Sequence, residues 1–190
     1  MAISYASVTI RHAVPEDAEG IIAVIVETWL ATYPNGELGL TVEVLRRYLE
    51  GEAGEKKLER IARARRRIEA SGTSDFPGYA DFVAVLGGRI VGWTHPRITD
   101  EGRRRVGTLY VLPSFHGHRI GHLLLERNLA WHGVSQDVYL NVVTYNEHAR
   151  RFYERHGFVL TGEEGHDEAA LIGGLIMPEL EMIRKGHSGR

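Results

Sequence analysis

The pattern of hydrophobic and polar residues predicts a chain in which strands and helices alternate. Residues 6–12 alternate in polarity at every second position, which is the period of a strand. Pro15 then opens a segment in which apolar residues recur at helical spacing as far as about Ala31. We therefore expect a strand over residues 6–12 and a helix over residues 16–31.

Two further helices are expected before residue 71. Thr41 has the position of a helix N-cap and Gly51 that of a helix end, and residues 55–70 carry a thin apolar stripe on an otherwise charged helix. A basic amphipathic helix can touch a membrane or a partner. Glutamates dilute the positive face here, however, which favours a surface helix packed by its stripe.

A β-hairpin is predicted where two apolar runs, residues 80–86 and 89–93, are joined by Gly87-Gly88. Both glycines can take the positive φ that a type I′ turn requires. Pro96 is expected to end the second strand, and the turn at residues 99–102 leads into a third strand. These three strands are expected to be antiparallel.

The stretch from Val106 to Leu160 holds the elements around which the rest of the chain is arranged. They are a strand at 108–112, a turn at 116–121, a helix at 120–131, a strand at 138–143, a short helix opening at Asn146 and a strand beginning near Phe158. A last apolar stretch covers residues 171–183. With 190 residues, 43% of them hydrophobic, the chain can bury one full core, so we expect a single α/β domain with a mixed sheet.

The composition argues against several classes of protein. The 23 basic residues are balanced by 25 acidic ones, unlike in a strongly basic nucleic-acid binder. The absence of cysteine excludes disulfides, thiolate nucleophiles and cysteine-containing zinc sites. The start of the chain does not resemble a signal peptide, and no apolar run has the length of a membrane span. We expect a cytoplasmic protein with neither nucleic acid nor membrane as its partner.

The turn before the helix at 120–131 has the features of an anion site. Unpaired N–H groups at the start of a helix point along a dipole whose positive end faces outward. Gly117 and Gly121 allow a phosphate to approach the main chain. An ordinary strand-to-helix turn with two glycines remains the alternative.

Three histidines in this turn raise the question of a metal site. His118 and His122 have the i, i+4 spacing that can place two imidazoles on one ion, and His116 lies nearby. A third ligand is not found at a suitable spacing, so we expect no metal.

Two blocks of this region together resemble the GNAT superfamily of acyl-CoA-dependent N-acetyltransferases. Residues 116–121, His-Gly-His-Arg-Ile-Gly, look like the Q/R-x-x-G-x-G/A loop that binds the pyrophosphate of coenzyme A in that family. Residues 146–158 look like its N-x-x-A-x-x-F-Y-x-x-x-G-F segment. The resemblance is specific from about residue 106 to 162 and does not cover residues 40–75.

The resemblance implies a mixed, mostly antiparallel central sheet flanked by helices, with acetyl-CoA as co-substrate. The strands at 108–112 and 138–143 would begin side by side and then splay apart, with the pantetheine arm of the cofactor in the gap. That arm would pair with the main chain of Leu109, Tyr110 and Val111. The pyrophosphate would lie on six loop residues, namely Gly117, His118, Arg119, Ile120, Gly121 and His122.

Two residues of the second block are implied to act near the reacting thioether. Asn146 corresponds to an asparagine beside the cofactor arm and is also a good helix N-cap. Tyr153 corresponds to the tyrosine that protonates the departing thiolate, although its position after Phe152 also suits a core residue. Trp29 and Tyr33 share a helix face and either wall a pocket or belong to the core.

Three positions depart from the family pattern. His116 stands where Gln or Arg is usual, and Arg119 replaces a glycine, which is tolerable if the backbone there is already helical. Asn141 stands where several members carry a glutamate general base. An amide cannot take that proton, so we expect it to leave through water, passing to His95, His116 or Tyr145.

The expected reaction is direct transfer of an acetyl group to a primary amine of a small molecule or peptide within a ternary complex. Because the chain has no cysteine, a covalent Cys-acyl intermediate is excluded. A non-catalytic acyl-CoA-binding module and an unrelated phosphate-binding α/β protein remain as alternatives. The acceptor, the general base, a homodimer and the role of residues 41–70 stay open, and the tail at 184–190 is expected to be disordered.

Overall fold

The computed structural model describes residues 8–71, 78–165, 171–172 and 175–186. Two short 3-10 turns, η2 (Pro15–Asp17) and η3 (Pro113–Phe115), precede α1 and α4. The helices are α1 (Ala18–Thr32), α2 (Val42–Glu50), α3 (Glu55–Ser71), α4 (Ile120–His132) and α5 (Glu147–Glu154). The strands are β1 (Thr9–His12), β2 (Phe82–Leu86), β3 (Arg89–Ile98), β4 (Arg104–Val111), β5 (Val138–Val143), β6 (Val159–Gly165), β7 (Leu171–Ile172), β8 (Leu175–Ile176) and β9 (Glu179–Arg184).

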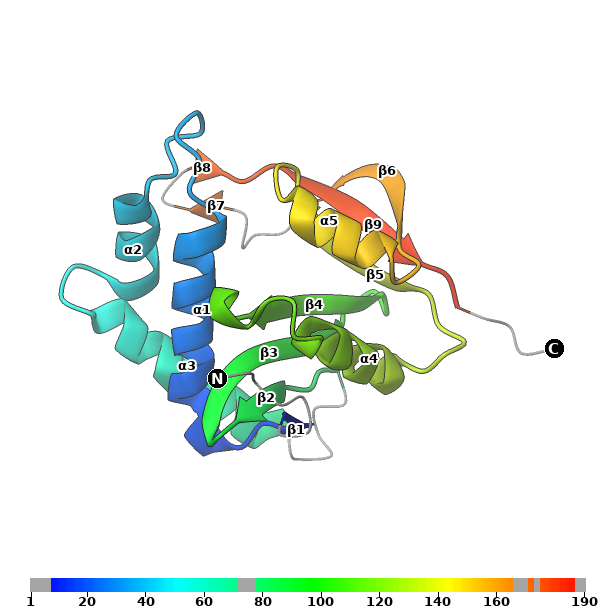
Figure 1. The fold of residues 1–190 in the computed structure, drawn as a ribbon, viewed down its shortest axis with the longest axis horizontal. Helices are drawn as coiled ribbons and strands as arrows, with labels where there is room; N and C mark the ends of the chain where they lie inside the picture. The colour runs from blue at the N-terminus through cyan, green and yellow to red at the C-terminus, as the bar shows by residue number, and fades with distance from the viewer. Residues whose placement is uncertain (1–7, 72–77, 166–170, 173–174, 187–190) are drawn as a thin grey trace.

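A seven-stranded mixed sheet in the order β1-β2-β3-β4-β5-β9-β6 forms the centre of the fold. Figure 1 shows α1, α2 and α3 gathered at one end, with α4 in front of β3 and β4 and α5 in front of β5 and β9. The expected fold class, a mixed and mostly antiparallel sheet flanked by helices, is confirmed. No helix in the described parts of the chain combines the length and the apolar character needed to cross a bilayer.

The first four strands form an antiparallel meander. Gly87 and Gly88 have φ values of +55° and +80°, as the predicted hairpin turn requires. The predicted strand end at Pro96 is wrong, because β3 continues to Ile98. The register of β3 against β4 shifts on both sides of His95, and this bulge leaves the proline, which has no N–H, without a partner position in the ladder.

The three N-terminal helices pack on one another and on the meander. Thr41 caps α2 by accepting a 3.2 Å hydrogen bond from the amide of Val44, and Gly51 ends the helix with a φ of +80°. Buried residues of α1, α2 and α3 form one apolar cluster with Val83 and Trp93 of the sheet. The extra helical segment expected at 41–70 is therefore joined to the core by its apolar stripe.

Helix α4 is fixed across two strands by a buried amide. Asn128 donates hydrogen bonds from Nδ2 to Thr94 Oγ1 (2.7 Å) in β3 and to the carbonyl of Val106 (3.0 Å) in β4. Buried amides of this kind hold an element in one place because every alternative position leaves them unpaired. The N-terminus of α4 is thereby held close to the end of β4.

The last apolar stretch, expected at residues 171–183, contains three strands. Among the described strands β7 pairs with β8 alone, while β9 lies between β5 and β6 and pairs antiparallel with both. Arg184 ends β9, and the amide of Gly186 donates to Asp137 at 2.9 Å. The remainder of the expected tail, residues 187–190, lies outside the described residues.

The sheet is split between β4 and β5. These strands are parallel, and their register contains only the pairs Arg104–Val138 and Arg105–Tyr139. Beyond this point β5 follows β9 on its other side, with partners as far as Val143. The predicted splay is confirmed, and it opens the sheet toward the carboxyl ends of both strands.

Candidate active site

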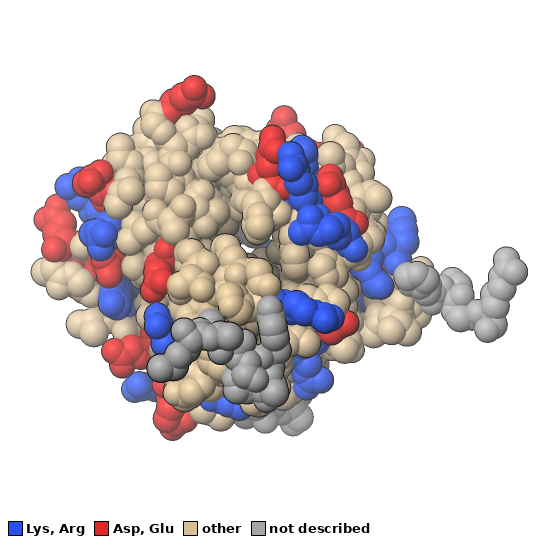
Figure 2. Space-filling model, viewed as in Figure 1, with Lys and Arg blue, Asp and Glu red and all other residues tan. Residues whose placement is uncertain are grey.

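A cavity of about 820 Å³ occupies the split between β4 and β5. It is lined by residues of α1, β4, β5, α4 and α5 and by Glu179 of β9. Figure 2 shows a hollow near the middle of the visible face, bordered mostly by uncharged side chains. Volumes of this size are typical of sites for cofactors and small molecules.

The predicted phosphate loop borders the cavity. Gly117, Arg119, Ile120, Gly121 and His122 all line it. His118 is not among the lining residues, and its Nδ1–H donates to the carbonyl of His116 at 2.8 Å. The side chain of His118 therefore makes a hydrogen bond within the loop and does not face the cavity.

Arg119 does not have the helical backbone that the sequence led us to expect. Its φ of +58° and ψ of +5° are left-handed, and no other non-glycine residue among those described has a positive φ. This conformation turns the chain into α4 at Ile120, and a glycine would adopt it at no steric cost. Arg119, which has a Cβ, lines the cavity in a strained backbone conformation.

The start of α4 offers main-chain donors to the cavity. The first amides of a helix have no partner within it, and the first residues of α4 are cavity-lining. A Cβ at Gly121 would lie 3.6 Å from the ring of Phe152 and 3.8 Å from Val111. Gly121 thus leaves an opening between α4, α5 and β4.

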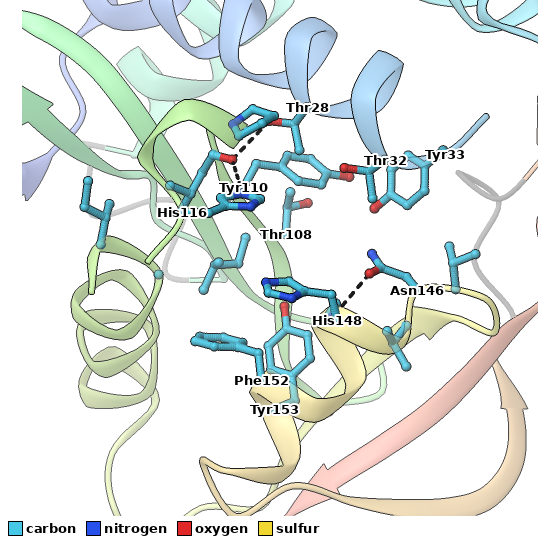
Figure 3. A pocket seen from close by; sticks show the side chains of 18 of the residues that line it. Thr28, Thr32, Tyr33, Thr108, Tyr110, His116, Asn146, His148, Phe152 and Tyr153 are labelled. Carbon is cyan, nitrogen blue, oxygen red and sulfur yellow. Dashed lines mark hydrogen bonds between the residues drawn. The ribbon is translucent and has the colours of Figure 1, made fainter. Parts of the chain in front are cut away.

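The end of β4 forms one wall of the cavity. Leu109, Tyr110 and Val111 line it, and β3 pairs with them on the opposite side. The carbonyl of Val111 accepts hydrogen bonds from His116 Nε2 (3.0 Å) and Thr28 Oγ1 (3.5 Å), as drawn in Figure 3. His116, treated from the sequence as a departure from a loop pattern, thus ties the loop to β4.

Asn146 and Tyr153 reach the cavity from α5. Asn146 Oδ1 accepts a 3.1 Å hydrogen bond from the amide of Ala149, so its N-cap role is confirmed. Tyr153 is only 8% exposed and packs among core residues such as Phe158, yet Figure 3 shows its hydroxyl directed into the cavity. Burial, reinforced by nearby Tyr110, raises the pKa of the Tyr153 phenol, so its proton is retained at neutral pH.

Aromatic residues from α1 and β4 line the side of the cavity that lies opposite α5. Trp29 Nε1 donates to the hydroxyl of Tyr110 at 2.8 Å, and the Trp29 and Tyr33 rings meet edge to face at 5.2 Å. Trp29 is buried in the core cluster and also lines the cavity, so both interpretations of this residue hold. Burial chiefly, then Tyr110, raises the pKa of Tyr33, with smaller contributions from Tyr153 and Glu179.

A carboxylate that the sequence did not locate lies in the cavity. Glu179 of β9 lines it and accepts a 3.0 Å hydrogen bond from Asn141 Nδ2. Arg105 donates to Asn141 Oδ1, and both residues also line the cavity. The sequence indicates only an apolar stretch over residues 171–183, and nothing in it places β9 beside β5.

Only one of the three proton carriers expected from the sequence lines the cavity. His116 does so, whereas His95 lies 3.3 Å from Asp81 and the hydroxyl of Tyr145 donates to the carbonyl of Tyr33 at 3.1 Å. Asp81 is buried away from the cavity, where it also accepts hydrogen bonds from Arg67 and Trp93.

Histidines pair across the mouth of the cavity. His116 and His148 stack with ring centroids 5.7 Å apart. His122 Nδ1 lies 2.8 Å from His156 Nε2, and His122 Nε2 lies 3.2 Å from a carboxylate oxygen of Glu126. Within the described ranges, no three His, Cys, Asp or Glu residues are grouped so that they could hold a metal ion.

Comparison with known proteins shows what the region around this site is similar to. Residues 78–160 match the family model of the acetyltransferase (GNAT) domain. A probable N-acetyltransferase of Mycobacterium tuberculosis is 36% identical over 87 residues, which cover 45% of this chain and 49% of the relative. An uncharacterized N-acetyltransferase of Mycobacterium bovis is 33% identical over 90 residues, or 45% and 56% of the two chains. The chain spans about half the length of these curated relatives.

Solved structures share the fold over nearly the whole chain. The PaiA N-acetyltransferase of Thermoplasma acidophilum, in complex with coenzyme A, superposes with a TM-score of 0.68 at 22% identity, covering 94% of this chain and 99% of the other. A GNAT-family acetyltransferase of Streptococcus pneumoniae gives a TM-score of 0.68 at 21% identity, with 95% and 99% covered. Residues 78–160 thus match the acetyltransferase (GNAT) domain, and the fold of this chain is shared with solved N-acetyltransferases.

Proposed function

We propose that this protein transfers an acetyl group from acetyl-CoA to a primary amine. One observation carries the proposal: a single cavity joins the amides at the start of α4 to the buried hydroxyl of Tyr153 through the split between β4 and β5. This arrangement supports the proposal, because an anion site, a trough for an extended arm and a proton donor would then follow one another in the order that a thioester cofactor needs.

Acetyl-CoA is the proposed co-substrate. Its pyrophosphate would lie against Gly117, Arg119, Ile120, Gly121 and His122, with His118 supporting the loop from behind. The amide groups of the pantetheine arm would pair with the main chain of β4 at Leu109, Tyr110 and Val111, which line the cavity, and Asn146 would border the arm from α5. In the Thermoplasma structure coenzyme A is bound to a protein of the same fold.

Each chemical step has a group to support it. The amine attacks the thioester carbonyl directly, and main-chain N–H groups near Val111 would polarise that carbonyl. Tyr153 then gives its proton to the departing thiolate. Since the phenol of Tyr153 is protonated at neutral pH, it suits a donor better than a base.

The proposed acceptor is a small-molecule amine or a peptide, reached from the side of the cavity opposite the loop. We place the reaction in a single domain over residues 1–190 in the cytoplasm, with α2 and α3 supporting the wall that α1 contributes. A homodimer stays an open prediction.

Release of free thiol tests this function. The protein is incubated with acetyl-CoA and a panel of primary amines, and thiol is followed with a chromogenic disulfide while calorimetry measures coenzyme A binding. Amine-dependent thiol release is expected. Binding without release would favour a non-catalytic acyl-CoA-binding module, and affinity for inorganic pyrophosphate without affinity for coenzyme A would favour an unrelated phosphate-binding protein.

A further inference from the structure

The carboxylate of Glu179 reaches the cavity from a strand that lies outside the split. In the antiparallel pairing of β5 with β9, Val143 is opposite Glu179 and Asn141 is opposite Glu181. Because side chains two residues apart on a strand share a face, all four lie on one face of this strand pair. Two glutamates therefore share this face. Glu179 lines the main cavity, and Glu181 lines a second, smaller one.

A chain of polar contacts fixes the orientation of Glu179. Its carboxylate accepts from Asn141 Nδ2 at 3.0 Å, and the oxygen of the same amide accepts from Arg105. Arg105 in turn donates to Glu181 at 3.2 Å, and Glu181 is held from its other side by Arg103 at 3.1 Å. Arg105 is thus paired with Glu181, and the neutral amide of Asn141 bridges Arg105 and the carboxylate of Glu179.

The main chain also makes room for this arrangement. Gly165 of β6 is opposite Glu179, and a Cβ placed there would lie 2.7 Å from Glu179 Cβ and 2.9 Å from Asn141 Cγ. Contacts this short are not tolerated, so the pair fits only beside a residue without a side chain. The absence of a Cβ at Gly165 leaves the space in which Asn141 and Glu179 meet.

The surroundings of Glu179 suit an organic cation. Trp29, Tyr33, Tyr110 and Met177 line the same cavity, and aromatic faces attract ammonium groups while their edges accept an apolar body. Among the described residues, the titratable and charged groups that line this cavity or act on it include Arg105 and Tyr110 of β4, Glu181 of β9, Tyr33 after α1 and Tyr153 of α5, with Glu163 and Glu164 of β6 beside the second cavity.

We propose that Glu179, oriented by Asn141, binds the acceptor as an ammonium ion and takes its proton, and that the acceptor is a primary alkylamine on an uncharged, apolar or aromatic body. This inference rests on the proposed acetyl transfer and names its base and its acceptor class. Asn141 is a positioning residue in this scheme, and it takes no proton itself.

The proton steps balance as follows. The ammonium gives one proton to the Glu179 carboxylate, which leaves a neutral amine and a carboxylic acid. The amine nitrogen forms a bond to the acetyl carbon while the carbon–sulfur bond breaks, and the sulfur takes the electron pair and then the proton of Tyr153. The second proton of the attacking nitrogen returns to the Tyr153 phenolate through water, and Glu179 releases its proton to solvent. The products are the amide, the free thiol and one proton.

The Glu179→Gln variant tests the role of the carboxylate. A glutamine can still accept from Asn141 but cannot take a proton, so packing and the contact chain are kept. At pH 7 we expect kcat/KM for phenethylamine to fall on the order of a hundredfold. The wild-type profile should be level over the neutral range. That of the variant should rise about tenfold per pH unit toward the pKa of the amine, near about 10, because only the amine already neutral in solution can react.

Glu27→Gln is the matched control. It makes the same change of charge on α1, at an exposed residue that is paired with Arg89 at 3.7 Å and does not line the cavity. We expect its pH profile and its kcat/KM to match the wild type. Asn141→Leu should keep the carboxylate but lose its orientation, with a smaller loss in kcat/KM and a level profile.

A pair of acceptors tests the proposed class. Phenylalanine is phenethylamine with a carboxylate on the carbon that bears the amine, and that charge would lie beside Glu179. We expect phenethylamine to be preferred at least about tenfold in kcat/KM by the wild type, and the preference to shrink in Glu179→Gln. Equal use of both amines by the wild type overturns the acceptor class.

A Glu179→Gln profile parallel to that of the wild type, with the same KM for the amine, overturns the base assignment and leaves acetyl transfer intact. Failure of the proposed function is recognised separately, because the wild type would then release no thiol with any amine of the panel. Calorimetry with coenzyme A serves as a folding control, since Glu179→Gln should bind it as the wild type does.

Discussion

The ring and the hydroxyl of Tyr153 have different roles, packing for the ring and the proposed chemistry for the hydroxyl. The ring is buried among core residues and the oxygen faces the cavity, so Tyr153→Phe removes the chemistry and keeps the packing. We expect kcat to fall on the order of a hundredfold, with the affinity for coenzyme A and the thermal midpoint little changed. Steady-state kinetics together with calorimetry check this, and a variant with wild-type turnover would leave Tyr153 only its place in the core.

Single residues are the scale at which the sequence predicted least. Its motifs located Asn146, Tyr153 and the glycines of the loop, because these belong to continuous segments. Glu179 was missed since its distance from Asn141 depends on β9 inserting between β5 and β6, which is a pairing of strands far apart in the chain. The sequence also does not indicate that His116 lines the cavity while His95 and Tyr145 do not, because this difference depends on contacts between segments far apart in the chain.

At the scale of elements, the entry into α4 combines backbone strain with a charge. Arg119 is left-handed, which costs a residue with a Cβ about 1 kcal/mol relative to glycine. Arg119→Gly should therefore raise the free energy of unfolding by about 1 kcal/mol. The same variant should bind coenzyme A more weakly, because it lacks the positive charge of Arg119, a residue that lines the cavity.

Arg119→Ala is the matched variant, since it also lacks the guanidinium but keeps the strained Cβ. Both variants should lose affinity for coenzyme A to a similar degree in calorimetry, and only the glycine variant should be more stable in urea. Equal stability of the two would show that the left-handed turn carries no strain, and unchanged affinity would remove Arg119 from the cofactor site.

Local patterns predicted most elements, and the exceptions have a common cause. The hairpin at Gly87-Gly88 and the Thr41 and Asn146 caps follow from neighbouring residues, so the sequence sufficed for them. Proline cannot donate a hydrogen bond to a strand ladder, so the sequence predicts a strand end at Pro96. The bulge at His95 leaves Pro96 without a partner position in the ladder, so β3 can continue past it. A bulge depends on the partner strand, and a single strand's sequence does not report it.

For the whole molecule, a buried carboxylate joins the helical end to the sheet. Asp81 of the segment before β2 is 2% exposed and accepts from Arg67 of α3 (2.9 Å) and Trp93 of β3 (2.8 Å). Burial acts to raise the pKa of Asp81, but the contacts with His95 and Arg67 together outweigh it and hold this pKa well below its ordinary value. Because the pKa of Asp81 is lower in the folded than in the unfolded protein, its carboxylate stabilises the fold at pH values above its unfolded pKa of about 4. This contribution is lost as the pH falls below that unfolded pKa.

Asp81→Asn should therefore destabilise the protein by about 3 kcal/mol at pH 7, because it leaves Arg67 without its carboxylate. The difference from the wild type should shrink as the pH is lowered from about 4 toward 2. Urea unfolding at several pH values measures this. Comparing the two proteins at each pH cancels the contribution of His132, whose pKa burial lowers to about 4. A constant difference would contradict the assigned titration.

The splay between β4 and β5 gives this sheet two extra edges in its interior. Strand edges are places where amide hydrogens exchange readily with solvent, because local opening there breaks few contacts. An extended ligand lying along β4 would act as a temporary eighth strand, so we expect coenzyme A to slow deuterium uptake by residues 108–111 and 140–143 while leaving β1 and β2 unaffected. Exchange read by mass spectrometry, residue range by residue range, would then show the cofactor completing a sheet that the polypeptide leaves open.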